Sequence, residues 1–441
     1  MAWKTDDVDA KNTDGEDAAD NGGDSTQEGS PDKKTKDEET QDFPFLPGHS
    51  SDDEAPTEVL EGMDKAETSE VPLVNKEGRL AKPPAVAPEE PRDEAHAESV
   101  NAESVNAESA ATEPMDEAAV LDAWNVKLRE IHEAVGRVVI GHQDAVNAIL
   151  YSLLARGHCL LVGVPGVGKT LLVKTLSRLL GVSYGRIQFT PDLMPSDITG
   201  TEILEEDMTS GHRRFVFAPG PIFTNILLAD EINRTPPKTQ AALLEGMQEK
   251  NVSIAGKSHQ LEEPFLVLAT QNPIEQEGTY PLPEAQLDRF LFAMNLGYPT
   301  AEEEHRVVDG HSYMPTEELE PVVGGDEILA VREAVAKIPA APPVVDYAVR
   351  LVRATRPEDE TSPDYIKKWI QWGGSPRASQ NLILAGRARA ACQGRFNVAR
   401  EDIRILAPWV LRHRLIRTFQ AEADGETTDS ILERLLAEVA D

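Results

Sequence analysis

The sequence predicts an α/β fold, in which helices flank a parallel sheet, followed by an all-α domain. Three observations predict this class. A glycine-rich loop at residues 163–170 lies between an apolar run and a helical pattern. Two later apolar runs, 226–229 and 265–270, end in polar side chains, as buried parallel strands do at a functional edge. Beyond residue 300 the apolar residues recur at helical spacing.

Residues 1–115 differ from the rest of the chain in charge and in apolar content. They contain 31 acidic and 10 basic residues and only three aromatic ones, Trp3, Phe43 and Phe45. Such a segment cannot bury enough apolar surface to offset the entropy lost on ordering. We therefore expect a disordered acidic extension. Its apolar island, residues 42–47, is either a docking peptide or an incidental cluster.

Composition limits the function classes for the whole chain of 441 residues. The formal net charge of −34 disfavours non-specific binding to nucleic acid or to anionic lipid. No apolar run approaches the ~20 residues that span a bilayer, and the first residues lack an apolar signal core. The two cysteines, Cys159 and Cys392, have neither metal nor redox spacing, so we expect a reducing, cytoplasmic location.

The remaining length suits two domains, which we place at residues 116–298 and 299–441. Within the first, the loop fits the pattern G-x-x-x-x-G-K-[ST] and has the required strand before it and helix after it. Its backbone N–H groups can surround phosphate oxygens. The lysine can reach the β- and γ-phosphates of ATP, and the threonine hydroxyl can bind Mg²⁺. The loop residues are Gly163, Val164, Pro165, Gly166, Val167, Gly168, Lys169 and Thr170.

Carboxylates follow the next apolar strand, where Asp230 and Glu231 end the run 226–229. Carboxyl ends of neighbouring parallel strands meet at one edge, so we expect this pair beside the phosphate loop. Asp230 can hold Mg²⁺, usually through its water, and Glu231 can polarise the attacking water. The strand at 265–270 leads to Asn272, whose amide either aligns that water or only forms an Asn-Pro turn.

The second domain reads as helical. Residues 300–303 carry a helix-capping signature, and amphipathic spacing predicts helices at 328–336, 346–355, 377–393 and 401–419. This pattern predicts an all-α lid after the α/β core.

Four spaced strings together resemble the AAA+ superfamily, and within it the MoxR family. They are residues 230–240, 269–273, 282–290 and 374–378, and they follow the phosphate loop in this order. The resemblance runs from about residue 116 to the end of the chain. It implies an AAA+ P-loop core with a helical lid.

The resemblance also implies roles for single residues. Asn272 matches the sensor 1 position, and Arg289 matches the arginine finger that reaches the nucleotide of a neighbouring subunit. Arg377 matches sensor 2, which contacts the nucleotide of its own subunit. Guanidinium groups suit these roles because they are fixed donors for phosphoryl oxygens. Arg289 could instead be a surface charge at the end of a helix, and Arg377 could be an arginine at the start of a helix that binds no ligand. Arg234 either lines the subunit interface or pairs with a carboxylate, and His142 is expected to be structural.

Two insertions narrow the resemblance. The stretch from 199 to 219 has room for a hairpin, and residues 250–263 form a second one that turns at 255–257. The pattern resembles the clade with a helix-2 insert and a pre-sensor-1 insert, whose hairpins line the pore of a ring. The alternative is a pair of surface hairpins that only lengthen loops.

The sequence therefore predicts an ATP-hydrolysing homo-oligomer, a hexameric ring that remodels or matures a client protein that the sequence does not name. The resemblance adds a partner with a von Willebrand factor A domain. Two alternatives stay open: a regulator in which ATP occupancy controls docking, and a DNA translocase or helicase-related ATPase. The acidic charge counts against the translocase.

Overall fold

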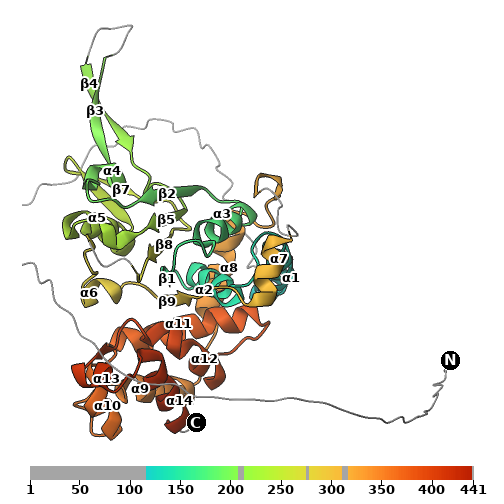
Figure 1. Cartoon of the computed structure of the whole chain (residues 1–441). Coiled ribbons are helices and arrows are strands. Elements are labelled where there is room, and N and C mark those ends of the chain that lie inside the picture. Colours follow the sequence, from blue (N-terminus) through green and yellow to red (C-terminus); the bar gives the residue numbers. More distant parts are fainter. Residues whose placement is uncertain (1–115, 207–212, 275–277, 310–315, 440–441) are drawn as a thin grey trace, which may run out of the picture. The chain divides into compact units, whose positions relative to one another are not determined.

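The computed structural model describes residues 116–206, 213–274, 278–309 and 316–439 (Figure 1). The predicted acidic extension, residues 1–115, lies outside this part of the chain. Among the helices of the described part, none combines the length and the apolar character of a bilayer span.

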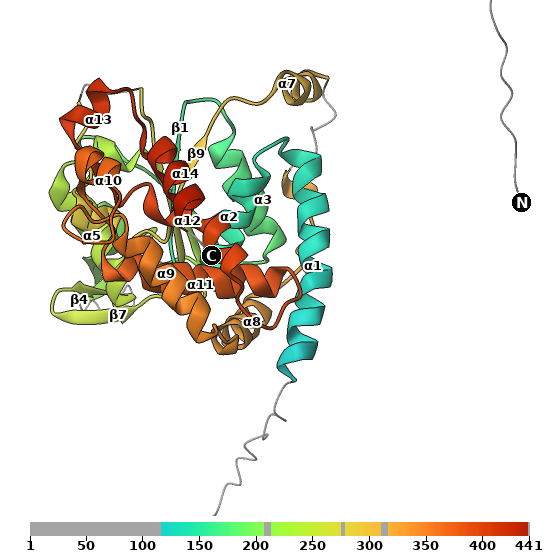
Figure 2. The same ribbon diagram turned by 90° about the horizontal axis from the view of Figure 1, so that it is seen from below.

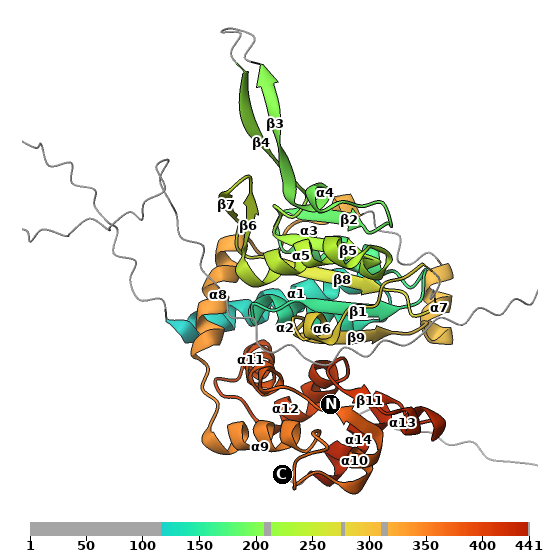
Figure 3. The same ribbon diagram turned by 90° about the vertical axis from the view of Figure 1, so that its left-hand side faces the viewer.

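A five-stranded sheet organises the first domain, and all of its pairings are parallel. The strand order is β2-β5-β8-β1-β9, which Figure 3 shows from β2 down to β9. The strands are β1 (Cys159–Gly163), β2 (Tyr184–Gln188), β5 (Ile226–Asp230), β8 (Leu266–Gln271) and β9 (Phe292–Leu296). Every residue of β5 is buried, because helices cover both faces of the sheet. The predicted parallel sheet flanked by helices is confirmed.

Alternate residues of the strands enter two separate apolar clusters, one on each face of the sheet. On one face, Leu161 and Leu228 pack with three helices, and on the other Leu160 and Leu227 pack with α5. This alternation follows from the two-residue period of a strand. The helices are α1 (Glu117–Val138), α2 (Gln143–Leu154) and α3 (Lys169–Leu179) on the first face and α5 (Pro237–Glu249) on the second.

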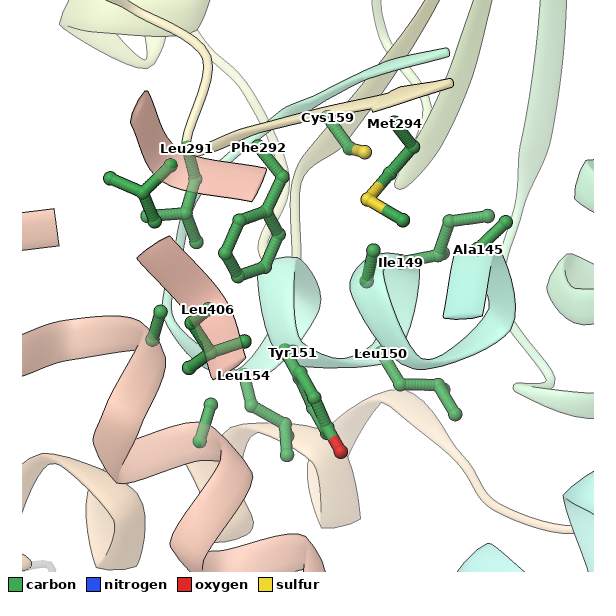
Figure 4. Packing of buried hydrophobic residues seen from close by; sticks show 14 of the residues in the cluster. Ala145, Ile149, Leu150, Tyr151, Leu154, Cys159, Leu291, Phe292, Met294 and Leu406 are labelled. Atoms are coloured by element: carbon green, nitrogen blue, oxygen red, sulfur yellow. The ribbon is translucent and has the colours of Figure 1, made fainter. Parts of the chain in front are cut away.

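The lid is helical and packs against the β9 edge of the sheet and against α1 and α2 (Figure 2). Figure 4 shows Ile149 and Leu154 of α2 in one cluster with Cys159 and Met294 of the sheet and Leu406 of the lid. One apolar cluster therefore continues from the sheet into the lid. The lid elements are α9 (Pro342–Arg353), α10 (Asp364–Trp369), β10 (Ile370–Trp372), α11 (Pro376–Cys392), α12 (Arg400–Leu411), β11 (Ile416–Arg417), α13 (Phe419–Ala423) and α14 (Thr428–Glu438).

The second half differs from the sequence prediction in two places. The helix expected at 401–419 ends at Leu411, because the chain then turns to pair β11 with β10. Two helices that the sequence assigns to the lid, α7 (Ala301–Val308) and α8 (Gly325–Lys337), also contact elements of the core. Helix α8 packs on α1 and α2 as well as on α11 of the lid, and Glu303 of α7 lies beside Gly141, the residue before His142 at the start of α2.

Both predicted hairpins are confirmed. The first joins β3 (Gly200–Glu206) to β4 (Arg213–Pro219), and the second joins β6 (Asn251–Ile254) to β7 (Lys257–Gln260). The hairpins are fastened together, because the rings of Phe217 and His259 stack with centroids 4.0 Å apart and Lys257 pairs with Glu202 at 3.2 Å. The short elements that remain are α4 (Pro195–Thr199), η1 (Ile232–Arg234), α6 (Glu284–Leu287) and η2 (Thr316–Glu318).

Candidate active site

The glycine-rich loop joins β1 to α3 at the carboxyl edge of the sheet, as the sequence predicts. Gly166 and Gly168 have φ angles of 84° and 79°, in the left-handed region that side chains rarely adopt. Gly168 is the N-cap of α3, so the first helical N–H groups face the loop. Between these glycines, Val167 is buried and anchors the loop.

Gly163 is required for a different reason. A Cβ atom at this position would lie 2.7 Å from the carbonyl oxygen of Leu296, in the neighbouring strand β9. The first glycine of the loop therefore permits close packing of two strands, whereas Gly166 and Gly168 permit the turn.

Lys169 begins α3, and Thr170 follows it in the first turn. The ammonium group of Lys169 donates to the carbonyl oxygens of Gly163 and Val164, the second at 3.2 Å, so it lies inside the loop. Burial lowers the pKa of Lys169, and the charges of Asp230 and Glu231 act in the opposite direction. Lys169 and the two carboxylates lie at or after the ends of β1 and β5, which both pair with β8, so they share the carboxyl edge of the sheet.

Asp230 ends β5 and is 8% exposed. Its Oδ1 accepts from the hydroxyl of Thr270 at 2.6 Å, and its Oδ2 accepts from the guanidinium of Arg186 at 2.7 Å. Two neighbouring strands, β8 and β2, thus supply the partners that hold this carboxylate.

Glu231 follows in the left-handed conformation, with a φ of 57°. Its backbone N–H donates to the Thr270 hydroxyl at 2.8 Å, which stabilises this uncommon conformation. Its Oε2 accepts from the amide of Gln188 at 2.7 Å and lies 3.1 Å from Nε of Arg234. Arg234 therefore pairs with a carboxylate here, one of its two predicted alternatives.

Asn272 lies just beyond β8, next along the edge from Glu231, and is 5% exposed. Its Oδ1 accepts from the N–H of Ile274 at 3.2 Å, which is the expected turn. Its Nδ2 is buried and has no hydrogen-bond partner among the residues that the structure describes. A buried amide donor without a partner costs free energy unless a ligand atom satisfies it.

The remaining two arginines lie elsewhere. Arg289 and Arg377 line one cavity of about 240 Å³ together with Arg156 and His158, which precede β1. The phosphate loop follows β1, about 16 Å away along the strand. Arg289 donates to the carbonyl of Leu244 at 2.7 Å. The expectation that Arg377 contacts the nucleotide of its own subunit is not met in this arrangement.

His142 begins α2 with a φ of 58°, and its Nε2 lies 3.1 Å from the carbonyl oxygen of Val167. The histidine thus contacts the backbone of the phosphate loop, which agrees with the expected structural role.

Sequence reasoning missed Thr270, Arg186 and Gln188. One signal could have indicated the last two: they stand two apart at the end of a short strand, so both side chains point to one face. The register then places Gln188 opposite Asp230. That register depends on the strand order, which local pattern does not reveal.

Comparisons with known proteins identify the family of this chain. The profile described as "ATPase family associated with various cellular activities (AAA)" matches residues 158–292, and the profile of the AAA lid domain matches residues 364–435. Chaperone MoxR1 of Mycobacterium tuberculosis is 46% identical over 306 residues, which cover 69% of this chain and 80% of that protein. The Bacillus subtilis protein YeaC is 44% identical over 308 residues, covering 70% of this chain and 92% of the relative.

A solved structure shows the same fold. A crystal structure from Cytophaga hutchinsonii, of a protein assigned as an ATPase, superposes with a TM-score of 0.67 at 40% sequence identity. It covers 73% of this chain and 97% of its own. The relatives share more than 40% of their residues with this chain over about 70% of its length, and the chain belongs to the MoxR family of AAA+ ATPases.

Proposed function

We propose that this chain hydrolyses ATP with Mg²⁺ and uses the turnover in a homo-oligomeric ring to remodel or mature a client protein. The observation that carries the proposal is the geometry of Glu231. Its carboxylate is held by Gln188 and Arg234 at the edge where Lys169 lies inside the phosphate loop. A protein that only bound nucleotide would not need an oriented carboxylate there.

The side chains present fit a nucleotide and its metal ion. Mg²⁺ would supply charge neutralisation between the β- and γ-phosphates, held by Thr170 and by Asp230. Lys169 would turn its ammonium group from the loop carbonyls to phosphate oxygens. Glu231 would orient the attacking water and take up its proton, and the unpartnered Nδ2 of Asn272 would donate to the water or to the γ-phosphate.

Arg289 and Arg377 complete the site from another copy of the chain. They share one cavity at the end of β1 that is remote from the loop, so neither serves the loop of its own subunit in this arrangement. A head-to-tail ring would bring this cavity against the phosphate loop of the next subunit. A hexamer is the ring size that we propose, in line with the sequence prediction.

The two fastened hairpins would line the pore of such a ring and contact the client. Ile203, Leu204 and Phe215 of the first hairpin are about half exposed or more, which suits contact with an apolar segment. The name Chaperone MoxR1, borne by the tuberculosis relative, supports a client that is a protein. We further propose a cytoplasmic location and a partner that carries a von Willebrand factor A domain.

Substitution of Glu231 by glutamine tests the proposal. Glu231→Gln should lower the rate of phosphate release on the order of 10²-fold or more, while the Kd for ATP stays within about threefold. Glu245→Gln is the matched control, because it makes the same change at an exposed position of α5. An unchanged rate in Glu231→Gln would refute hydrolysis at this site.

Further measurements separate the competing functions. Tight ATP binding without measurable turnover in the unchanged protein would favour the binding regulator. Stimulation of turnover by single-stranded DNA would favour a translocase. Proteins retained by the Glu231→Gln variant in the presence of ATP would identify the client.

A further inference from the structure

A buried arginine of the lid, Arg414, fastens the segment that carries the proposed arginine finger. Its Nε donates to Oδ1 of Asp288 at 2.7 Å. Its Nη2 donates to the backbone carbonyls of Asp288 at 3.0 Å and Phe290 at 2.6 Å. Its Nη1 donates to the carbonyl of Leu291 at 3.3 Å and to that of Val410. Each of the five guanidinium N–H groups therefore has an acceptor.

Four of these five acceptors belong to residues 288–291, and Arg289 lies within this stretch. The backbone on both sides of Arg289 is thus fixed to the lid, while its own side chain lines the cavity and donates to the Leu244 carbonyl. Asp288 strengthens the attachment, since Ser375 donates to it at 3.3 Å and Arg377 lies 3.7 Å away.

Among the basic side chains, only an arginine can make this set of hydrogen bonds to residues 288–291. The Arg414 side chain is only 2% exposed, and burial lowers its pKa, an effect that Asp288 opposes. A lysine has three donors at a single point and cannot reach acceptors spread over residues 288–291. Loss of this guanidinium would remove one donor from the Asp288 carboxylate and from each of four backbone carbonyls.

We propose that Arg414 is a positioning residue for hydrolysis, which transmits the orientation of the lid to Arg289. The inference rests on the proposed function, because it requires Arg289 to act on the nucleotide of the next subunit. A lid that turned relative to the sheet would move residues 288–291 with it, since the guanidinium bridges α12 and the segment just before β9. The lid would then set the reach of the finger in the neighbouring site.

Arg414→Lys in the full chain is the test, and Arg332→Lys is the matched control. Arg332 is also buried, but its hydrogen bonds go to Leu153 and Glu263 instead. We expect Arg414→Lys to lower kcat on the order of 10²-fold through misplacement of Arg289, with the Kd for ATP within about threefold. Without nucleotide, the amides of residues 288–291 should exchange faster in Arg414→Lys. Arg332→Lys should keep kcat within about twofold of the unchanged protein.

Mixing subunits gives a readout that a general structural defect would not produce. Arg414→Lys subunits keep an intact phosphate loop and Glu231, whereas Glu231→Gln subunits keep an intact finger. In an equimolar random ring, about one quarter of the interfaces pair the two intact halves, and activity should return to about that fraction of the unchanged protein. Arg289→Ala, mixed with Glu231→Gln in parallel, should recover in the same way.

The outcomes distinguish the inference from the proposed function. Full turnover of Arg289→Ala would overturn the inference and the role of Arg289 in the next subunit, whereas hydrolysis at Glu231 would stand. If Arg289→Ala is inactive and recovers on mixing, the proposed function stands. In that case, unchanged turnover of Arg414→Lys, or a loss that mixing does not recover, overturns the inference. Should Arg414→Lys fail to fold, Asp288→Asn replaces it. That variant should lose about tenfold in kcat and recover on mixing, and unchanged turnover of the folded protein overturns the inference equally.

Discussion

Thr270 offers the sharpest single test of how the carboxylate edge is held. This side chain of β8 is fully buried, and its hydroxyl makes two hydrogen bonds. It donates to Oδ1 of Asp230 at 2.6 Å and accepts from the N–H of Glu231 at 2.8 Å. Thr270→Val keeps the shape of the side chain and removes both bonds. Thr270→Ser keeps the hydroxyl and removes only a methyl group.

The magnitudes follow from the two bonds. A hydrogen bond to a charged group contributes about 1.5–3 kcal/mol, and a buried N–H left without a partner costs about 1–3 kcal/mol. We therefore expect Thr270→Val to lower the free energy of unfolding by about 2.5–6 kcal/mol. Thr270→Ser should cost about 1 kcal/mol, the value of one buried methyl group.

Turnover should respond more than nucleotide binding. Without the Thr270 hydroxyl, the backbone of Glu231 loses the bond that holds its left-handed conformation, which costs a side-chain-bearing residue on the order of 1–3 kcal/mol. Its carboxylate would then leave its oriented position, so kcat should fall at least about tenfold. The Kd for ATP should stay within about threefold, because Lys169 is not among the hydrogen-bond partners of Thr270.

Urea unfolding without nucleotide gives the stabilities, and phosphate release gives kcat. If Thr270→Val is as stable as Thr270→Ser within about 0.5 kcal/mol, the two bonds do not stabilise the edge as argued. If its kcat equals that of the serine variant, Thr270 does not orient Glu231.

Three further results are expected. Lys169→Ala should abolish binding of a fluorescent ATP analogue, because it removes the cation inside the loop; unchanged affinity would contradict the assignment of this loop. A chain that starts near Asp116 should keep turnover within about tenfold of the full chain, because residues 1–115 carry no nucleotide motif; a larger loss would make that segment part of the enzyme. Burial lowers the pKa of His158 to about 4, below the ordinary value of 6.5. The stability that the neutral, buried histidine contributes is therefore fully present above pH 6.5 and is lost as the pH falls toward 4. Between about pH 7 and pH 4.5, the free energy of unfolding should decrease by roughly 2–3 kcal/mol less in His158→Asn than in the unchanged protein. An equal decrease in both proteins would refute the lowered pKa of His158.

The sequence could predict those parts of the site that are contiguous in the chain. The loop from Gly163 to Thr170 carries its own turn chemistry, and Asp230 and Glu231 follow directly from an apolar strand. The sheet and the hairpins were predictable for the same reason, because strand and turn signals are local.

The rest depends on contacts between distant segments. Thr270 and Gln188 meet the acidic pair only because β5 lies between β2 and β8. Arg377 was assigned by position in a motif, but its place follows from the docking of α11 on α1 and α2, far from the loop. The end of α12 at Leu411 likewise reflects the pairing of β11 with β10, which the helical spacing of 401–419 does not contain.

The close approach of Leu296 to Gly163 helps to distinguish active relatives from relatives that no longer use nucleotide. A side chain at position 163 would separate β1 from β9. Replacement of this glycine would therefore impair folding before it affected the binding of ATP. Gly166 and Gly168 have open space around them and are held to glycine by their φ angles alone. A descendant that had ceased to use nucleotide would therefore shed Lys169 and the two turn glycines while retaining Gly163. A relative that keeps only the first glycine has retained the packing of its sheet. Only a relative that also keeps Gly166, Gly168 and Lys169 is expected to bind and hydrolyse ATP.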